Sequence, residues 1–394
     1  MSVIADKINN FLTSASWIRK MFEEGDRLRK IHGADNVYDF TLGNPVNEPP
    51  KAFHQKLKQL ADNPIPGMHR YMSNAGYPET RQAVAEVLSE NSDVNIRPNH
   101  IVMTVGAGGG LNVILKAILN PGDEVIVLAP YFVEYRFYVD NHNGVLKEVS
   151  TDEHFLPDLN TIAAAMTEKT RAVIINSPNN PTGVVYPPEV LVKLEKLVAE
   201  KSKEYGRPIY VISDEPYSKI AYDVEVPSVF KYITNSIMVT SHSKDLALPG
   251  ERIGYAAVSP NIENVELLLE AMVFCNRTLG YVNAPALMQR LVVDLQRESV
   301  DIEEYREKRD LLYNSLINLG FKMVKPEGAF YLFPKSPVPD DVQFAQLALK
   351  HNILVVPGAG FGKPGYFRLA YCIDKQVIEN SLPAWKALAK ELNL

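Results

Sequence analysis

The chain has 394 residues and a mass of 44.1 kDa, enough for two or three packed units. Its 41 lysines and arginines against 47 aspartates and glutamates give a net charge of −6, which argues against a nucleic-acid or membrane-surface partner. Its apolar runs are far shorter than the roughly 18 to 20 residues of a membrane-spanning helix. The two cysteines, Cys275 and Cys372, cannot build a disulfide framework or a four-thiolate zinc site, and the N-terminus has no secretory pattern. We therefore expect a cytoplasmic protein without a metal site.

The first 50 residues lack a dense alternation of strands and helices, whereas the following region has one. Compact β-branched runs there predict strands, and they occupy residues 100–106, 123–130, 170–178, 209–216, 236–244 and 252–259. Between the runs lie stretches with helical spacing, such as residues 187–206, where Pro187 and Pro188 suit a first turn and Gly206 suits a stop. Apolar strands that alternate with helices are typical of a parallel sheet buried on both faces. We predict an α/β fold.

The chain after about residue 285 changes character again. It carries a long charged helix (IEEYREKRDLLYNSLINLG), a strand pair flanking GAFYLF, and a final amphipathic helix. We predict a large domain over residues 51–284 and a smaller α+β domain formed by residues 1–50 and 285–394.

Polar or glycine-rich residues follow most of the predicted strands, at the edge where ligands of parallel sheets collect. They are Gly106–Gly110, Pro130–Phe132, Asn179–Gly183, Asp214–Tyr217 and Ser241–Lys244, with Arg252 eight residues later. A glycine-rich turn before a helix lets backbone N–H groups approach a phosphate, although such a turn is more often plain packing. Neither the dinucleotide spacing nor the nucleoside-triphosphate spacing of glycines is present, and GAGFGKP at 358–364 is only a near miss.

Lys244 and Asp214 carry the chemical interpretation. At the end of an apolar strand Lys244 would be partly desolvated, which lowers its pKa and frees its amine to bond to an aldehyde; a lone lysine there is more often a surface residue. Asp214 could pair with a protonated ring nitrogen or simply cap the next helix. Together, an amine for the aldehyde and a carboxylate for the pyridinium indicate a pyridoxal 5'-phosphate site.

Three motifs, SPNNPTG at 177–183, SDEPYS at 213–218 and SHSKDLALPGERIGY at 241–255, make the chain resemble the class I/II aminotransferases, the aspartate aminotransferase relatives of fold type I. The similarity runs from LGNP at 42–45 to FRLAYC at 367–372. It implies a large domain whose mostly parallel central sheet is flanked by helices. It also implies a pyridoxal-phosphate enzyme that moves an amino group from an L-amino acid to a 2-oxo acid, such as 2-oxoglutarate, by a ping-pong mechanism.

The resemblance also implies roles for the residues at the cofactor ring. Lys244 matches the lysine that bonds to the cofactor aldehyde and carries the substrate α-proton. Asp214 would pair with the pyridine nitrogen, Tyr217 and Asn180 would hydrogen-bond the ring oxygen, and Phe132 would stack on the ring face, although most such aromatics are core residues.

Further implied positions hold the phosphate and the substrate. The phosphate groups would be Arg252, Ser241, Ser243 and the backbone N–H of Ala107 and Gly108. Substrate would contact Gly43, Asn180 and Arg368, the last gripping the α-carboxylate with a bidentate fork. Tyr71 matches a tyrosine that reaches the neighbouring subunit's phosphate, which implies a homodimer with shared active sites.

The sequence does not assign every role in the site. The GAGGG turn lacks the hydroxyl or lysine that some relatives place there, and no second arginine is assigned for a substrate side-chain carboxylate. Arg277 is a candidate, but a surface or interface ion pair is its more ordinary role. His242 is left out because strand alternation would turn it away from Lys244. A β-lyase, a decarboxylase, a synthase or a non-catalytic pyridoxal-phosphate-binding module remains an alternative, and the amino donor is open, with aspartate first.

Overall fold

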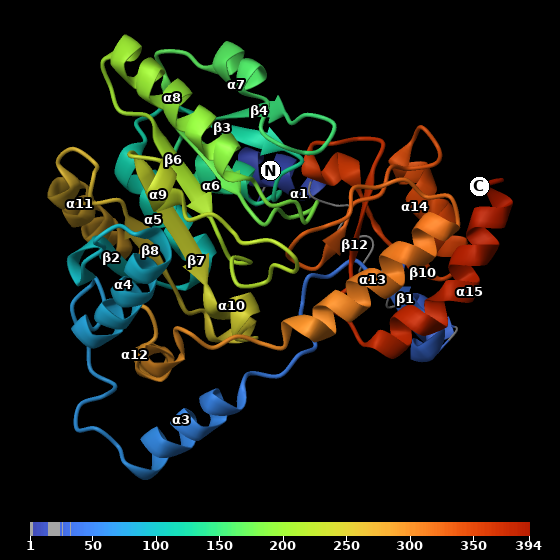
Figure 1. Cartoon of the computed structure of the whole chain (residues 1–394), viewed down its shortest axis with the longest axis horizontal. Coiled ribbons are helices and arrows are strands. Elements are labelled where there is room, and N and C mark those ends of the chain that lie inside the picture. Colours follow the sequence, from blue (N-terminus) through green and yellow to red (C-terminus); the bar gives the residue numbers. More distant parts are fainter. Residues whose placement is uncertain (1–2, 15–23, 26, 32) are drawn as a thin grey trace.

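A sheet of seven strands forms the centre of the computed structural model, which describes residues 3–14, 24–25, 27–31 and 33–394 (Figure 1). The strand order is β2-β8-β7-β6-β5-β3-β4. Neighbouring strands from β7 to β4 are parallel, and β8 runs against β7 and β2. The strands are β2 Ile101–Thr104, β3 Glu124–Ala129, β4 Val145–Ser150, β5 Thr170–Asn176, β6 Tyr210–Asp214, β7 Ser236–Ser241 and β8 Gly254–Val258. The predicted α/β architecture with a mostly parallel sheet is confirmed.

Each predicted strand run contains a strand, but the runs extend too far. The run 236–244 ends as a strand at Ser241, and the one-turn helix α10 (His242–Asp245) follows. β4 was not predicted, because it lies at the sheet edge with mostly exposed or half-buried residues and so lacks a continuous apolar run.

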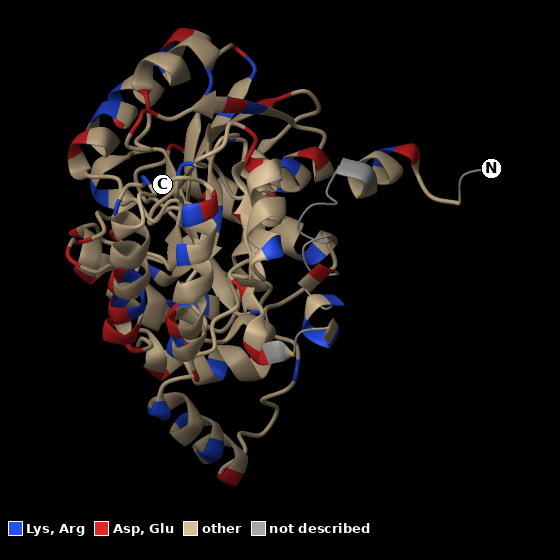
Figure 2. Ribbon diagram, turned by 90° about the vertical axis from the view of Figure 1, so that its right-hand side faces the viewer, with Lys and Arg blue, Asp and Glu red and all other residues tan. Residues whose placement is uncertain are grey.

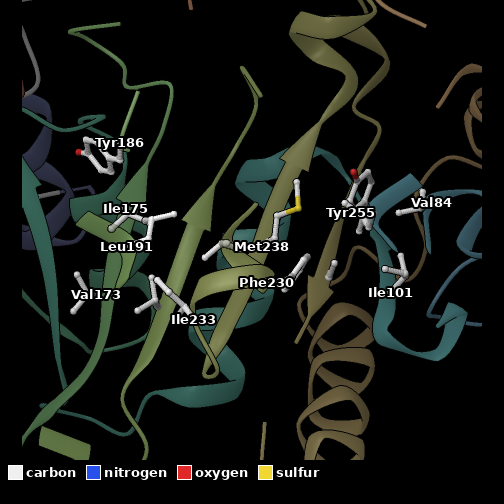
Figure 3. Packing of buried hydrophobic residues seen from close by; sticks show 14 of the residues in the cluster. Val84, Ile101, Val173, Ile175, Tyr186, Leu191, Phe230, Ile233, Met238 and Tyr255 are labelled. Carbon is white, nitrogen blue, oxygen red and sulfur yellow. The ribbon is translucent and has the colours of Figure 1, made fainter. Parts of the chain in front are cut away.

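Alternate residues of the strands enter two separate cores, one on each face of the sheet. In β5, Val173 and Ile175 pack on one face, and Ala172 and Ile174 on the other. The first face is covered by α4 (Pro78–Ser92), α7 (Leu159–Ala165), α8 (Pro188–Tyr205), α9 (Val229–Tyr232) and α12 (Ala286–Val292). The second face is covered by α5 (Gly106–Ile118), α6 (Tyr135–Asn141) and α11 (Val265–Thr278). Figure 3 shows the first core, with Val173, Ile175 and Met238 of the strands beside Leu191 of α8 and Phe230 of α9.

The predicted boundaries of α8 are confirmed. Pro188 is its first residue, and Gly206 follows its end with a φ of 64°, a left-handed conformation that glycine adopts at low cost. Leu191, Leu194 and Val198 form its buried face.

The two ends of the chain meet in a smaller unit beside the sheet. β1 (Tyr38–Asp39) pairs in parallel with β10 (Ile353–Leu354). A three-stranded sheet is formed by β9 (Tyr331–Leu332), β11 (Val356–Pro357) and β12 (Phe367–Ala370), and the unit's helices are α13 (Ile302–Asn318), α14 (Asp341–Lys350) and α15 (Lys375–Glu391). They share one core, which includes Phe40, Phe344 and Trp385. Side chains between Ala284 and Leu295 still pack in the core of the seven-stranded sheet. The domain boundary near residue 285 therefore stays a prediction.

Two helices lie at the periphery. In Figures 1 and 2, α3 (Lys51–Asp62) lies at the foot of the molecule, where Phe53 and Leu60 reach the core. α1 (Asp6–Ser14) lies against α6 through the Phe11–Phe137 ring contact and the Lys7–Asp140 ion pair. Short 3-10 turns are η1 Ala34–Asn36, η2 Pro98–His100, η3 Pro249–Glu251, η4 Val293–Leu295 and η5 Gly358–Phe361. Among the described residues, no helix combines the length and apolarity needed to cross a membrane.

Candidate active site

A cavity of about 200 Å³ lies where the parallel strands end. The predicted residues that line it are Ala107, Gly108, Phe132, Asn180, Asp214, Tyr217, Ser241, Ser243, Lys244 and Arg252. The fold thus brings together ten residues that are spread over 146 positions of sequence, from 107 to 252. We call it the Lys244 cavity.

Lys244 lies on the one-turn helix α10, three residues beyond the end of β7, and not on the strand itself as predicted. Its Nζ donates a hydrogen bond to the Gly43 carbonyl oxygen at 2.6 Å and lies 5.5 Å from the centre of the Phe330 ring. Burial lowers the pKa of Lys244 to about 8, and the positive charges of Arg368 and Arg252 act in the same direction. A substantial fraction of the amine is therefore neutral near pH 8, as a nucleophile requires.

Asp214 is the last residue of β6 and is buried. Its Oδ2 accepts a hydrogen bond from the Tyr135 hydroxyl at 2.6 Å, while its Oδ1 is buried without a hydrogen-bond partner among the described residues. Burial raises the pKa of Asp214 to about 6, and the Tyr135 hydrogen bond opposes that rise. The unsatisfied oxygen is suited to a protonated nitrogen of a ligand in the cavity.

The N-terminus of α5 and the guanidinium of Arg252 lie together at the cavity. Gly106 begins this helix with a φ of 77°, and a Cβ there would lie 2.8 Å from Arg252 Nη2. Glycine therefore allows both the left-handed backbone and the close approach of the arginine. Arg252 Nη1 donates to the Pro249 carbonyl at 2.9 Å. Free backbone N–H groups and a fixed positive charge suit an anion such as a phosphate.

Arg368, on β12, does not line the Lys244 cavity but is joined to it through Asn180. Its Nη1 donates to Asn180 Oδ1 at 3.1 Å and its Nη2 donates to the Thr41 carbonyl at 2.6 Å. The guanidinium lies 4.7 Å from the ring centre of Tyr331 and 4.8 Å from that of Phe361. Its Nε is buried with no partner in the described part of the chain. The arginine is thus oriented by four groups and keeps a donor available.

Gly43 lies where no larger residue fits. A Cβ at this position would lie 2.1 Å from the Tyr331 hydroxyl. That hydroxyl is also 2.9 Å from the hydroxyl of Tyr217, which lines the cavity. Burial raises the pKa of Tyr217 well above its ordinary value, so this phenol stays protonated as a hydrogen-bond donor.

Tyr71 is the predicted residue that the single chain does not bring to this site. It is 89% exposed and lines a different cavity of about 620 Å³. Arg277 is exposed, lies 5.3 Å from the Phe274 ring centre, and lines a third cavity beside Glu266.

His242 belongs to helix α10, so the strand alternation used to exclude it does not apply. Its side chain nevertheless lines a cavity other than that of Lys244.

Four site residues were missed at the sequence level: Tyr135, Tyr138, Asn176 and Tyr331. Tyr138 and Asn176 line the Lys244 cavity, and the Asn176 side chain donates to the Asp214 carbonyl at 2.7 Å. Asn176 ends a predicted strand and Tyr331 lies in GAFYLF, so both had a positional signal. Tyr135 and Tyr138 lie on a short helix after Phe132, and sequence spacing did not indicate which face of it would meet Asp214.

These features fit pyridoxal 5'-phosphate. The Lys244 cavity offers an amine of lowered pKa for an aldehyde, a buried carboxylate with an unused oxygen for a ring nitrogen, and a helix N-terminus with an arginine for a phosphate.

Known proteins are similar to this sequence over most of its length. The sequence profile described as aminotransferase class I and II matches residues 35–384. A probable aspartate aminotransferase of Methanocaldococcus jannaschii is 33% identical over 354 residues, covering 86% of this chain and 90% of that protein. The aspartate/prephenate aminotransferase of Thermus thermophilus is 35% identical over 353 residues, covering 87% of this chain and 88% of the relative.

Solved structures show the same similarity in three dimensions. The crystal structure of an aminotransferase from Eubacterium rectale has a TM-score of 0.97 and 40% identity, and the match covers 100% of both chains. The Thermus thermophilus aspartate aminotransferase with maleate has a TM-score of 0.85 and 30% identity, covering 98% of this chain and 100% of that one.

Proposed function

Because this chain belongs to the class I and II aminotransferase family and is an aminotransferase, we propose that it transfers the amino group of an L-amino acid to a 2-oxo acid with pyridoxal 5'-phosphate bound in the Lys244 cavity. The observation that carries the proposal is the pairing, in one cavity, of an amine whose pKa is lowered to about 8 with a buried carboxylate that has a free oxygen. When bound, the cofactor supplies the aldehyde that takes up the amino group and a ring that withdraws electrons from the substrate α-carbon.

In this proposal Lys244 and Asp214 do the proton chemistry. Lys244 Nζ would hold the cofactor by its aldehyde. Once freed by the substrate amine, Nζ would accept the proton from the substrate α-carbon and then donate it to the cofactor. Asp214, ionised above its pKa of about 6, would accept a hydrogen bond from a protonated ring nitrogen with its unsatisfied Oδ1, while Tyr135 holds Oδ2. A charge-assisted hydrogen bond at that nitrogen keeps the ring an electron acceptor.

Other residues bind and orient. Of the residues that line the cavity, Arg252, Ser241, Ser243 and the N–H groups of Ala107 and Gly108 would hold the phosphate, and Phe132 would cover a ring face. Tyr217 and Asn180 would donate hydrogen bonds to the ring oxygen. Arg368, oriented by Tyr331, Phe361 and Thr41, takes the substrate α-carboxylate beside Gly43.

We further propose aspartate as a donor, because the relatives from M. jannaschii and T. thermophilus are described as a probable aspartate aminotransferase and an aspartate/prephenate aminotransferase. We propose 2-oxoglutarate as the acceptor. The proposal includes a cytoplasmic homodimer in which Tyr71 of each subunit completes the other's phosphate site. The exposure of Tyr71 and the burial of both free cysteines fit this arrangement.

The test is an assay of the purified holoenzyme with L-aspartate and 2-oxoglutarate, with glutamate as the measured product. We expect parallel double-reciprocal plots and, for Lys244→Ala, a loss of about a thousandfold or more in turnover. Release of ammonia or CO₂ in place of glutamate would instead assign a lyase or decarboxylase. Full turnover by Lys244→Ala would refute the proposal.

A further inference from the structure

A fourth, polar cavity of about 490 Å³ is lined in part by the immediate sequence neighbours of the Lys244-cavity residues. Glu215 follows Asp214, and His242 and Asp245 lie on either side of Lys244 on the same helical turn. The side chains of one turn of α10 are thus divided between two cavities, with Lys244 in one and Asp245 in the other.

Asp245 is the centre of a buried ionic cluster. It is 7% exposed, and its Oδ2 lies 3.1 Å from His242 Nδ1 and 3.2 Å from Lys219 Nζ. Burial alone would raise the pKa of Asp245, but His242 and Lys219 reverse the effect, so the pKa lies below its ordinary value. The carboxylate is therefore ionised and holds two cationic or hydrogen-bonding partners from two segments. We call these three residues the Asp245 cluster.

The Asp245 cluster joins α10 to two other parts of the chain. Lys219 Nζ also donates to the carbonyl oxygens of Gln296 at 2.7 Å and Glu298 at 3.0 Å. The backbone N–H of Val300 donates to the Asp245 carbonyl at 2.7 Å. Lys219 itself follows Asp214 by five residues, so one network connects the loop after β6, the helix of Lys244 and the segment 296–300.

A four-residue helix needs such anchors. One isolated turn fixes several dihedral angles for a single hydrogen bond, so it is not stable by itself and takes its position from tertiary contacts. Lys244 Nζ makes its hydrogen bond to the Gly43 carbonyl, a group on a different segment. The orientation of the lysine therefore depends on what holds the turn in place.

We propose that Asp245, acting through His242 and Lys219, is a positioning residue that holds the α10 turn so that Lys244 Nζ meets the reacting atoms. This inference rests on the proposed role of Lys244. The other titratable groups that line this polar cavity are Glu215, Glu225 and Tyr255, and the replacement of Asp245 leaves all three in the sequence.

The experiment uses holoenzyme variants with turnover expressed per cofactor-loaded site, counted from the visible absorbance. Asp245→Asn should lower kcat about tenfold or more while changing KM for the amino donor less than about twofold, because misplacement of about 1 Å costs up to a hundredfold. His242→Ala should also lower kcat, and His242→Asn, whose amide N–H can still donate to Asp245, should restore most of it. Asp93→Asn is the matched control, since it removes the charge from the exposed ion pair between Asp93, the residue after α4, and Lys231 of α9.

The outcomes distinguish an effect of Asp245 on the position of Lys244 from an effect on the stability of the fold. If Asp245→Asn and His242→Ala lower the thermal midpoint but leave kcat per loaded site unchanged, the inference is wrong. Equal losses for His242→Ala and His242→Asn would also overturn it. Should Asp245→Asn fail to fold, the two His242 variants decide the question. Full turnover by Lys244→Ala would instead show that the proposed function itself has failed.

Discussion

At the scale of single residues, the lowered pKa of Lys244 has a direct chemical consequence. Only the neutral amine attacks an aldehyde, and burial brings half-deprotonation from the ordinary 10.5 to about 8. We expect cofactor-free protein to take up pyridoxal phosphate at a rate that rises with pH and is half-maximal near pH 8, as followed by visible absorbance. N-acetyl-lysine amide in the same buffers is the control. A midpoint above pH 10 for the protein would contradict the assigned environment.

The raised pKa of Asp214 predicts that its carboxylate lowers the stability of the cofactor-free protein, although the proposed activity requires it. Its folded-state pKa, about 6, lies above the ordinary 3.8, so between these values the folded protein binds more protons than the unfolded chain. By linkage, stability of the cofactor-free protein is lost as pH rises through that window, by about 3 kcal/mol at most. Asp214→Asn should therefore raise the cofactor-free thermal midpoint at pH 7.5, and raise it less at pH 5. The holoenzyme of the same variant should lose most of its turnover.

The melting temperatures of Asp214→Asn and the natural protein test whether the carboxylate stabilises the fold. If Asp214→Asn melts at a lower temperature than the natural protein at pH 7.5, the unpaired oxygen is not the costly feature described above. Tyr135→Phe serves as a control, since removing its hydrogen bond to Oδ2 should destabilise the ionised carboxylate further.

At the scale of elements, β7 and β8 meet too closely at one position for any side chain. A Cβ on Gly254 would lie 2.3 Å from the Thr240 carbonyl oxygen and 3.0 Å from the Gly106 Cα. Both are backbone atoms, so the strand and the start of α5 would have to separate. Gly254→Ala should cost about 1 to 3 kcal/mol and lower the thermal midpoint by several degrees.

A neighbouring glycine supplies the control for that measurement. A Cβ on Gly250 would meet no atom of the described residues within 4 Å, so Gly250→Ala should leave the midpoint within about one degree. Equal midpoints for the two variants would show that the strands can adjust without cost.

The sequence predicted the elements well where they are buried and less well where they are not. Continuous apolar runs indicated the inner strands, and proline and glycine marked both ends of α8. The exposed edge strand β4 had no such run. The run 236–244 predicts a strand up to Lys244, because sequence alone does not reveal that the chain turns into α10 after Ser241.

For the site, the order of the motifs predicted ten residues that line one cavity. Most of the contacts that orient these residues could not be predicted from the sequence. Tyr135 meets Asp214 across 79 positions, and Arg368 meets Asn180 across 188. Such pairs depend on how helices and loops pack, which local spacing does not report. The residues with chemistry were predictable, and most of their supporting partners were not.

At the scale of the whole molecule, the proposed homodimer assigns Tyr71 to the active site of the partner subunit. Within one chain it is 89% exposed and lies at a cavity other than that of Lys244. If its hydroxyl serves the partner's phosphate, Tyr71→Ala and Lys244→Ala should each be inactive alone. Mixed and re-associated, the two variants should regain about one quarter of natural activity, because half of the random dimers are hybrids and each hybrid has one complete site.

The mixing experiment has one control and one outcome that would contradict the shared site. Each variant re-associated with itself should show no recovery, which controls for the treatment. Absence of activity in the mixture, with hybrid dimers demonstrated by mass, would place Tyr71 outside the partner's site.

The pairing of β1 with β10 also matters during synthesis on the ribosome. Tyr38 and Phe40 donate their backbone N–H groups to the carbonyl oxygens of Asn352 and Leu354, at 2.8 and 3.0 Å, so about nine-tenths of the polypeptide must be translated before those bonds can form. The central sheet, whose last strand ends at Val258, can assemble on the nascent chain well before then. Strand β1 is thus synthesised early but stays unpaired through most of elongation. Truncated products that stop before residue 352 lack its partner strand, so they expose an unpaired strand edge that chaperones or proteases can recognise.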